Sequence, residues 1–147
     1  MNNIIGLTKV RNEQHIIKDT LDNWGMICTG GIYVYDDVSD DKTVEICQNH
    51  PSVKEVIEGI LWDPDRERAD YKNRQRVLEA GKSHAMKNDW FVYFDADEHL
   101  YDFHEDGYDI LQNENIRAIA CRLFDVYITP EDIDDYYQDR KWIGPEY

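Results

Sequence analysis

The sequence lacks the cysteine patterns of a disulfide-linked or zinc-binding protein. Cys28, Cys47 and Cys121 lie far apart, and no Cys-x-x-Cys pair occurs. This pattern favours free thiols in a reducing compartment. The chain also lacks a charged start followed by an apolar run, and no apolar stretch approaches the roughly 20 residues of a membrane helix. We therefore expect a cytoplasmic protein with no signal peptide and no membrane span.

Positive charge is scarce. The chain has 16 Lys and Arg residues against 31 Asp and Glu, which gives a net charge of −15. An extended nucleic-acid surface needs clustered cations, so the net charge argues against nucleic acid as a partner, and it argues equally against an anionic membrane surface. A polyanionic ligand can still bind where a divalent metal and a few basic residues neutralise it.

What the chain does have is enough apolar sequence for one ordinary domain of 147 residues, arranged as alternating strands and helices. Buried strands are expected at 4–8, 32–35, within 53–60 and at 90–94. Helices are expected from Glu13, after Ser39 or Asp40, from Tyr71 to about Ala85, and over 106–112. Asn12 is the expected N-cap of the first helix. This alternation is typical of an α/β fold with a mostly parallel central sheet flanked by helices.

The most informative stretch is 90–99, where five large apolar residues run directly into an Asp-x-Asp motif. In extended backbone, side chains alternate between faces, so Asp95 and Asp97 are expected on the same side. Two carboxylates at the end of a strand can seat Mg²⁺ or Mn²⁺, which take their remaining ligands from water and substrate phosphates. The alternative for an isolated motif is a polar turn after a core strand.

Two other strand ends carry polar side chains. Segment 9–13 follows the first expected strand, and segment 36–40 follows the second. The carboxyl ends of parallel strands share one edge of a sheet, and ligands bind outside that edge. We therefore expect segments 9–13, 36–40 and 95–99 to gather at one site.

Segments 4–13, 34–41 and 93–98 together resemble the N-terminal, nucleotide-sugar-binding part of a family 2 glycosyltransferase. The resemblance implies a Rossmann-like GT-A fold over 1–147 as a single domain, with the acceptor-binding half short or truncated. It implies metal-dependent, inverting transfer of a sugar from a nucleotide-diphosphate-sugar donor. The acceptor, whether saccharide, lipid or protein, is not specified.

The resemblance also implies roles for individual residues. Val10, Arg11 and Glu13 would line the base and ribose, and Asp37 would accept a hydrogen bond from the base. The alternatives stay open. Residues 36–37 could form only a turn that ends a strand, and Arg11 could be a surface cation or an ion-pair partner of Glu13.

The diphosphate side of the site follows from the same resemblance. Asp97 would bind Mn²⁺ or Mg²⁺ directly, and Asp95 would hold the ribose hydroxyls or a metal-bound water. Arg68 would steady the diphosphate, with Arg66 competing for that role, although both lie in a charged run that is usually a solvated face. The general base is unassigned, since Glu131 and Asp132 fit a solvated acidic loop better.

Three other functions compete with this interpretation. Haloacid-dehalogenase-type phosphohydrolases also place Asp-x-Asp after a strand, but they have Thr or Val where this chain has His99. Nucleotidyltransferases of the same fold usually have a glycine-rich basic loop after the first strand, and segment 9–13 has no glycine. The third alternative is a domain that binds nucleotide-sugar without full transferase activity.

Overall fold

The computed structural model describes residues 2–101, 103, 105–113 and 115–119, apart from the side chains of 66, 105 and 106. The chain divides into two compact units, Met1–Ile116 and Arg117–Tyr147. All the helices and strands given below lie in the first unit. Residues 116–119 form no strand. The rest of the predicted β-rich segment 116–128 lies outside the described residues, as do Cys121 and the candidate bases Glu131 and Asp132.

Four parallel strands form the central sheet, in the order β3-β2-β1-β4. Their bounds are β1 Ile4–Val10, β2 Gly31–Asp36, β3 Val53–Glu58 and β4 Trp90–Asp95. The expected parallel sheet is confirmed, and the fold is of the α/β, Rossmann-like class.

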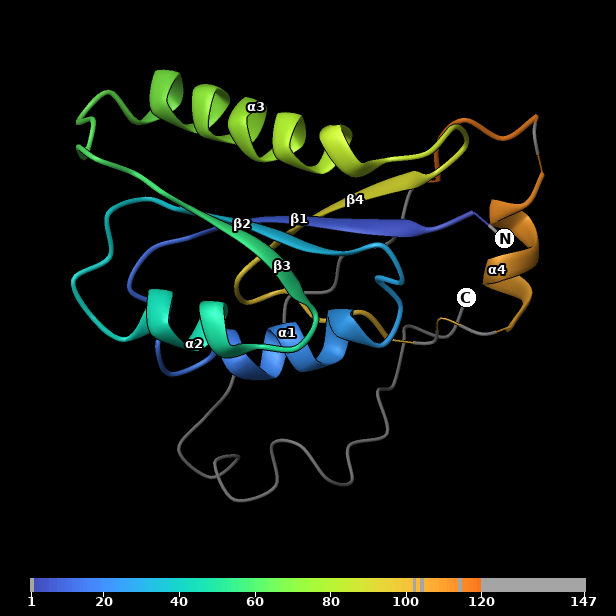
Figure 1. Cartoon of the computed structure of the whole chain (residues 1–147), viewed down its shortest axis with the longest axis horizontal. Helices are drawn as coiled ribbons and strands as arrows, with labels where there is room; N and C mark the ends of the chain where they lie inside the picture. Colours follow the sequence, from blue (N-terminus) through green and yellow to red (C-terminus); the bar gives the residue numbers. More distant parts are fainter. Residues whose placement is uncertain (1, 102, 104, 114, 120–147) are drawn as a thin grey trace, which may run out of the picture. The chain divides into compact units, whose positions relative to one another are not determined.

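The helices pack on both faces of this sheet. They are α1 Ile17–Gly25, α2 Thr43–Asn49, α3 Arg66–His84 and α4 Glu105–Leu111. Figure 1 shows α3 along one face and α1 with α2 along the opposite face. The loops that follow β1, β2 and β3 extend toward the same end of the sheet, at the left of the view.

Two cores, one on each face of the sheet, follow from the strand alternation. Ile4 and Val10 of β1 pack with α1, whereas Ile5 and Leu7 pack with Val77 of α3. A central strand buried on both faces needs apolar residues on both, which explains the nearly continuous apolar run of β1.

Glycine is required at position 6 of β1. A Cβ there would lie 2.8 Å from the Cys28 sulfur and 3.0 Å from Ile32. The residue therefore lets β1 approach its neighbours closely on the α1 face of the sheet.

The helix starts differ from those expected. Asn12 does not cap α1, which begins at Ile17 without a side-chain cap, because Asn12 adopts a left-handed conformation (φ 55°) and bonds to a neighbouring loop. α2 begins at Thr43, after Ser39 and Asp40. α3 begins at Arg66, before the expected Tyr71, because the Asp65 side chain accepts a hydrogen bond from the Arg68 backbone N–H.

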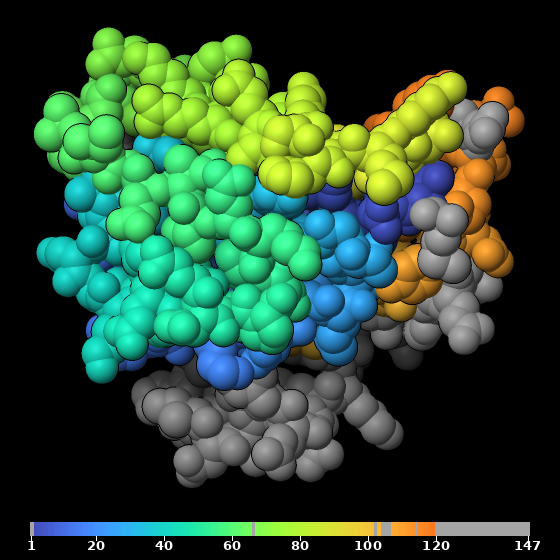
Figure 2. Space-filling model, in the orientation of Figure 1, coloured from blue at the N-terminus to red at the C-terminus, as the bar shows by residue number. Residues whose placement is uncertain are grey.

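β3 is an edge strand whose surface is polar. In Figure 2 the residues around β3, in green, lie on the visible face of the molecule, between α3 above and α2 below. Lys54 and Glu55 are exposed on the strand. Such charges oppose pairing of the edge with another chain. Among the described residues, no helix is both long and apolar enough to cross a membrane.

Candidate functional site

The strand order changes direction between β1 and β4, and the candidate site lies at their carboxyl ends. The chain moves outward from β1 through β2 to β3 and then returns to β4 on the other side of β1. In open α/β sheets, ligands bind at this switch in direction, outside the carboxyl ends of the strands. Lys9 of β1 and Asp95 of β4 are register partners at this point.

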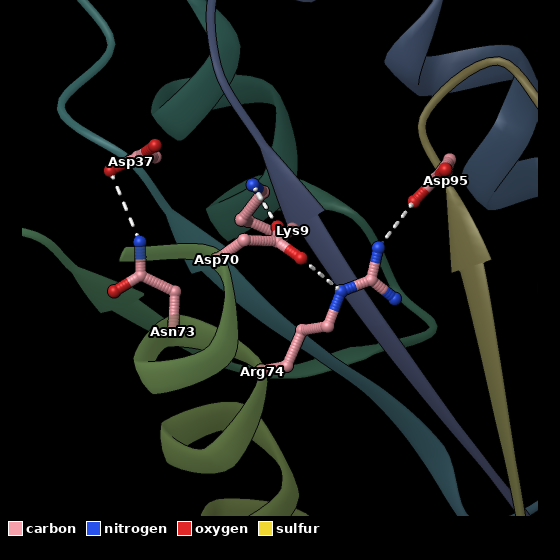
Figure 3. A network of polar contacts seen from close by, with 6 residues as sticks. All are labelled: Lys9, Asp37, Asp70, Asn73, Arg74 and Asp95. Carbon is pink, nitrogen blue, oxygen red and sulfur yellow. Dashed lines mark hydrogen bonds and ion pairs between the residues drawn. The ribbon is translucent and has the colours of Figure 1, made fainter. Parts of the chain in front are cut away.

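A chain of charged side chains joins the two strand ends to α3. Lys9 Nζ donates to Asp70 Oδ1, and Arg74 Nε donates to Asp70 Oδ2 at 2.7 Å. Arg74 Nη2 lies 3.7 Å from Asp95 Oδ1. Figure 3 shows these side chains pointing toward one another from β1, α3 and β4. The structure therefore holds a cation, Arg74, beside the first carboxylate of the Asp-x-Asp motif.

The orientation of Arg74 is fixed by more than its ion pairs. Its guanidinium carbon lies 3.9 Å from the centroid of the Tyr93 ring, within reach of a cation–π contact. Burial raises the pKa of Asp70, but hydrogen bonds from Lys9 and Arg74 outweigh it, and the net shift is downward. Asp70 therefore stays ionised and neutralises part of the positive charge that Lys9 and Arg74 bring to the site.

The turn that carries the Asp-x-Asp motif is anchored on α1. Thr20 Oγ1 donates to the carbonyl of Ala96, and Trp24 Nε1 donates to the carbonyl of Glu98 at 2.7 Å. Trp24 also stacks on Phe94 of β4, with ring centroids 4.6 Å apart. These contacts bury Ala96 and hold the turn in one place.

Asp95 and Asp97 are both exposed and flank the buried Ala96. The strand alternation predicted for them stops early, because β4 ends at Asp95 and the Glu98 N–H then bonds to the Asp95 carbonyl. The Glu98 carboxylate accepts from the Asp95 N–H in return. The motif is therefore a strand end followed by a turn.

The donor set at this turn fits a cation shared with a ligand. No group of three or more His, Cys, Asp or Glu side chains is placed to hold a metal within the described part of the chain. Mg²⁺ usually binds through one or two carboxylates plus substrate phosphates and water, and the exposed pair Asp95 and Asp97 matches that requirement. A closed protein cage, such as a structural zinc site, does not fit these residues.

The loops after β1 and β2 are tied to each other. Asn12 Oδ1 accepts from the Asp40 N–H, and the Asn12 N–H donates to Ser39 Oγ, each at 2.9 Å. The Glu13 N–H donates to Thr43 Oγ1 at 2.8 Å. Val38, between these contacts, adopts φ 62°, a conformation that costs energy for a β-branched residue. Cross-loop hydrogen bonds thus hold this edge of the site.

The predicted nucleotide-binding residues lie at this edge in different environments. Val10 is 1% exposed and packs in the core on the α1 face, whereas Arg11 is exposed. Burial raises the pKa of Glu13, and the negative charges of Asp97 and Asp41 raise it further. Asp37 is 2% exposed and accepts a hydrogen bond from Asn73 of α3 at 3.2 Å. Their contacts with a nucleotide stay predictions.

Arg68 is paired with acidic residues that precede α3. It pairs with Asp63 at 2.9 Å and with Asp65 at 3.6 Å, near the start of α3. The side chain of Arg66 lies outside the described residues. The predicted contact of Arg68 with a diphosphate therefore stays a prediction.

The residues that sequence reasoning missed are Asp70, Asn73 and Arg74. Together with Val77 they have the i, i+3, i+4, i+7 spacing of one helix face. This spacing is visible in the sequence, but three of the four residues are polar. The helix was also expected to start at Tyr71, after Asp70. Of these four positions, only Val77 is apolar.

Comparisons with known proteins bear on the fold. No protein-family model matches the chain. No curated protein matches it either. Among solved structures, that of S. aureus TarS 1-349, a glycosyltransferase, matches with a TM-score of 0.50 at 16% identity. The match covers 67% of this chain and 28% of the TarS chain. The chain therefore has a glycosyltransferase-like fold and spans less than a third of that protein.

Proposed function

We propose that this chain binds a nucleotide-diphosphate-sugar and transfers the sugar to an acceptor, in the manner of an inverting family 2 glycosyltransferase. The observation that carries the proposal is the exposed Asp95–Asp97 turn, with Arg74 beside it, at the switch point of a glycosyltransferase-like sheet. A saccharide, a lipid and a protein are all compatible as acceptor. A cytoplasmic location is part of the proposal.

The chemistry of the leaving group explains why these residues matter. As the bond from the sugar to the diphosphate breaks, negative charge builds on the β-phosphate. A Mn²⁺ or Mg²⁺ ion held by Asp97 and Asp95 would stabilise that charge. Only stabilisation that is stronger in the transition state than in the ground state raises the rate.

The chain's own residues complete the donor site in this proposal. Arg74 and Lys9 supply positive charge in an otherwise acidic molecule, and Asp70 holds both side chains in place. Arg11 and Glu13 lie on the loop that would contact the base and ribose. Val10 and Asp37 are both buried, and the Asp37 N–H donates to the Val10 carbonyl at 2.9 Å. In this proposal Asp37 accepts a hydrogen bond from the base.

Replacing Asp97 tests the proposal. We expect Asp97→Ala to abolish Mn²⁺-dependent binding of nucleoside diphosphates, because one carboxylate of a two-carboxylate site is lost. Asp109→Ala removes an exposed carboxylate from α4 and is the matched control, with binding unchanged. Binding can be measured by titration calorimetry with and without Mn²⁺. Undiminished metal-dependent affinity in Asp97→Ala contradicts the proposed site.

Turnover separates the transferase from a domain that only binds the donor. We expect the sugar to be transferred from the bound donor to one member of a panel of saccharide, lipid and protein acceptors. Phosphate release with a covalent phosphoryl group on Asp95 contradicts the transferase and supports a phosphohydrolase.

A further inference from the structure

Arg11 and Trp62 come from separate loops and contact each other. Arg11 directly follows β1, and Trp62 lies between β3 and α3. The guanidinium carbon of Arg11 is 4.8 Å from the centroid of the Trp62 ring. Because β2 lies between β1 and β3, the two loops leave the sheet on either side of the carboxyl end of β2.

The backbone fixes the loop that carries Trp62 against the end of β2. The Gly59 N–H donates to the carbonyl of Asp36 at 2.8 Å. A Cβ on Gly59 would lie only 2.9 Å from that same carbonyl oxygen, so the close approach requires glycine. The residue that follows β2 is Asp37, the predicted acceptor for a base N–H.

The chemistry of the pair suits a flat aromatic ligand. A guanidinium is planar and stacks on aromatic faces, and nucleobases stack both on aromatic side chains and on guanidinium planes. Arg11 is exposed, and Trp62 is 39% exposed. Among the described residues, Arg11 forms no ion pair with Glu13, and its guanidinium lies over the Trp62 ring.

We propose that Arg11 and Trp62 form the platform on which the nucleobase of the donor stacks. Trp62 is a positioning residue that holds the Arg11 guanidinium flat, and the base stacks on that plane above the end of β2. This inference rests on the proposed function, because the base belongs to the nucleotide-diphosphate-sugar. It adds Trp62 and the stacking geometry to the donor site.

The test compares a ligand that has a base with one that has none. UDP, GDP, CDP and dTDP are titrated with Mn²⁺ present, and inorganic pyrophosphate is titrated under the same conditions. Arg11→Lys keeps the charge and removes the plane, and Trp62→Ala removes the ring beneath it. Trp62→Phe keeps a ring. Leu61→Ala, which truncates the 83% exposed neighbour of Trp62, is the control for the loop.

We expect Arg11→Lys and Trp62→Ala to weaken the tightest nucleoside diphosphate about tenfold, the size of one base-stacking contact. Pyrophosphate affinity stays unchanged in both variants, Trp62→Phe restores most of the nucleotide affinity, and Leu61→Ala binds like wild type. Tryptophan emission of the wild type changes on nucleotide binding, and this change is smaller in Trp62→Phe.

Three results overturn the inference while leaving the proposed function standing. They are nucleotide affinity that is the same in all variants, equal losses for nucleotide and pyrophosphate, and a loss in Leu61→Ala as large as in Trp62→Ala. A wild-type chain that binds none of the four nucleoside diphosphates overturns the inference and the proposed function together.

Discussion

Single side chains at the carboxyl ends of β1 and β4 set the charge balance of the candidate site. Lys9 belongs to a central strand, its side chain is only 17% exposed, and it is bonded to Asp70. Arg74 shares the same carboxylate and reaches Asp95. A partly buried cation needs such a partner, because an unpaired charge loses part of its hydration without compensation.

The pairing of Lys9 gives a prediction about stability and pH. Lys9→Met should lower the free energy of unfolding by about 1 kcal/mol at pH 7, since a charged hydrogen bond is lost and Asp70 remains partly solvated. The pKa of Asp70 is lowered in the folded protein, so its contribution is present above its unfolded pKa and is lost as the pH falls through the folded value. Urea unfolding at pH 7 and pH 3 measures the loss of stability and its dependence on pH.

The difference in the free energy of unfolding between Lys9→Met and wild type should therefore become smaller below about pH 4, near the pKa of aspartate in an unfolded chain. Lys18→Met is the matched control, because Lys18 pairs with Asp22 on the exposed surface and should matter little. A difference that is the same at both pH values contradicts the assigned ion pair.

At the scale of elements, α1 and α3 position the two halves of the site. α1 holds the Asp-x-Asp turn through Thr20 and Trp24. α3 supplies Asp70, Asn73 and Arg74 to the opposite face of the sheet. The Asp-x-Asp turn is therefore part of the packed fold on one side and part of a charged network on the other.

Trp24→Phe tests whether the anchor on α1 matters for the site. The change removes the N–H donated to Glu98 and should lower the free energy of unfolding by about 1 kcal/mol, the value of one hydrogen bond. It should also weaken Mn²⁺-dependent binding of nucleoside diphosphate, because the turn is less firmly held.

Trp90→Phe is the matched control, since Trp90 Nε1 donates to the Leu111 carbonyl at 2.8 Å, away from the carboxyl ends of the strands. It should cost similar stability and leave nucleotide binding unchanged. Equal effects of the two variants on binding contradict a specific role for the α1 anchor. Urea unfolding and calorimetry give the two quantities.

The strands were predictable from sequence, because buried parallel strands leave continuous apolar runs. The shared edge of their carboxyl ends then follows from the parallel arrangement. The polar face of α3 was not predictable. In the sequence, Arg74 is one of many charged residues of this helix. Only the fold shows that it reaches Asp95 of β4 and shares Asp70 with Lys9 of β1. Asn12 was expected to cap a helix, yet its side chain bonds to Asp40 of the loop after β2, which is close in space but distant in sequence. Local sequence does not encode such a contact.

At the scale of the whole molecule, the two described cysteines test how the core is packed. Cys28 and Cys47 are buried, and burial raises the pKa of each thiol to about 12. We expect no more than one of the three thiols to react quickly with a thiol reagent at pH 8 in the folded protein, and all three in urea. Two or more fast thiols in the native protein contradict this core.

The proposed function requires that the chain bind a nucleotide-diphosphate-sugar through a metal. The direct measurement is the melting temperature with UDP-, GDP-, CDP- and dTDP-sugars, each with and without Mn²⁺. A ligand at 100 times its dissociation constant stabilises the native state by about 2.7 kcal/mol, so the melting temperature should rise with donor concentration. We expect this rise for at least one donor and only with Mn²⁺. A melting temperature that no donor changes, or that rises equally without the metal, contradicts it.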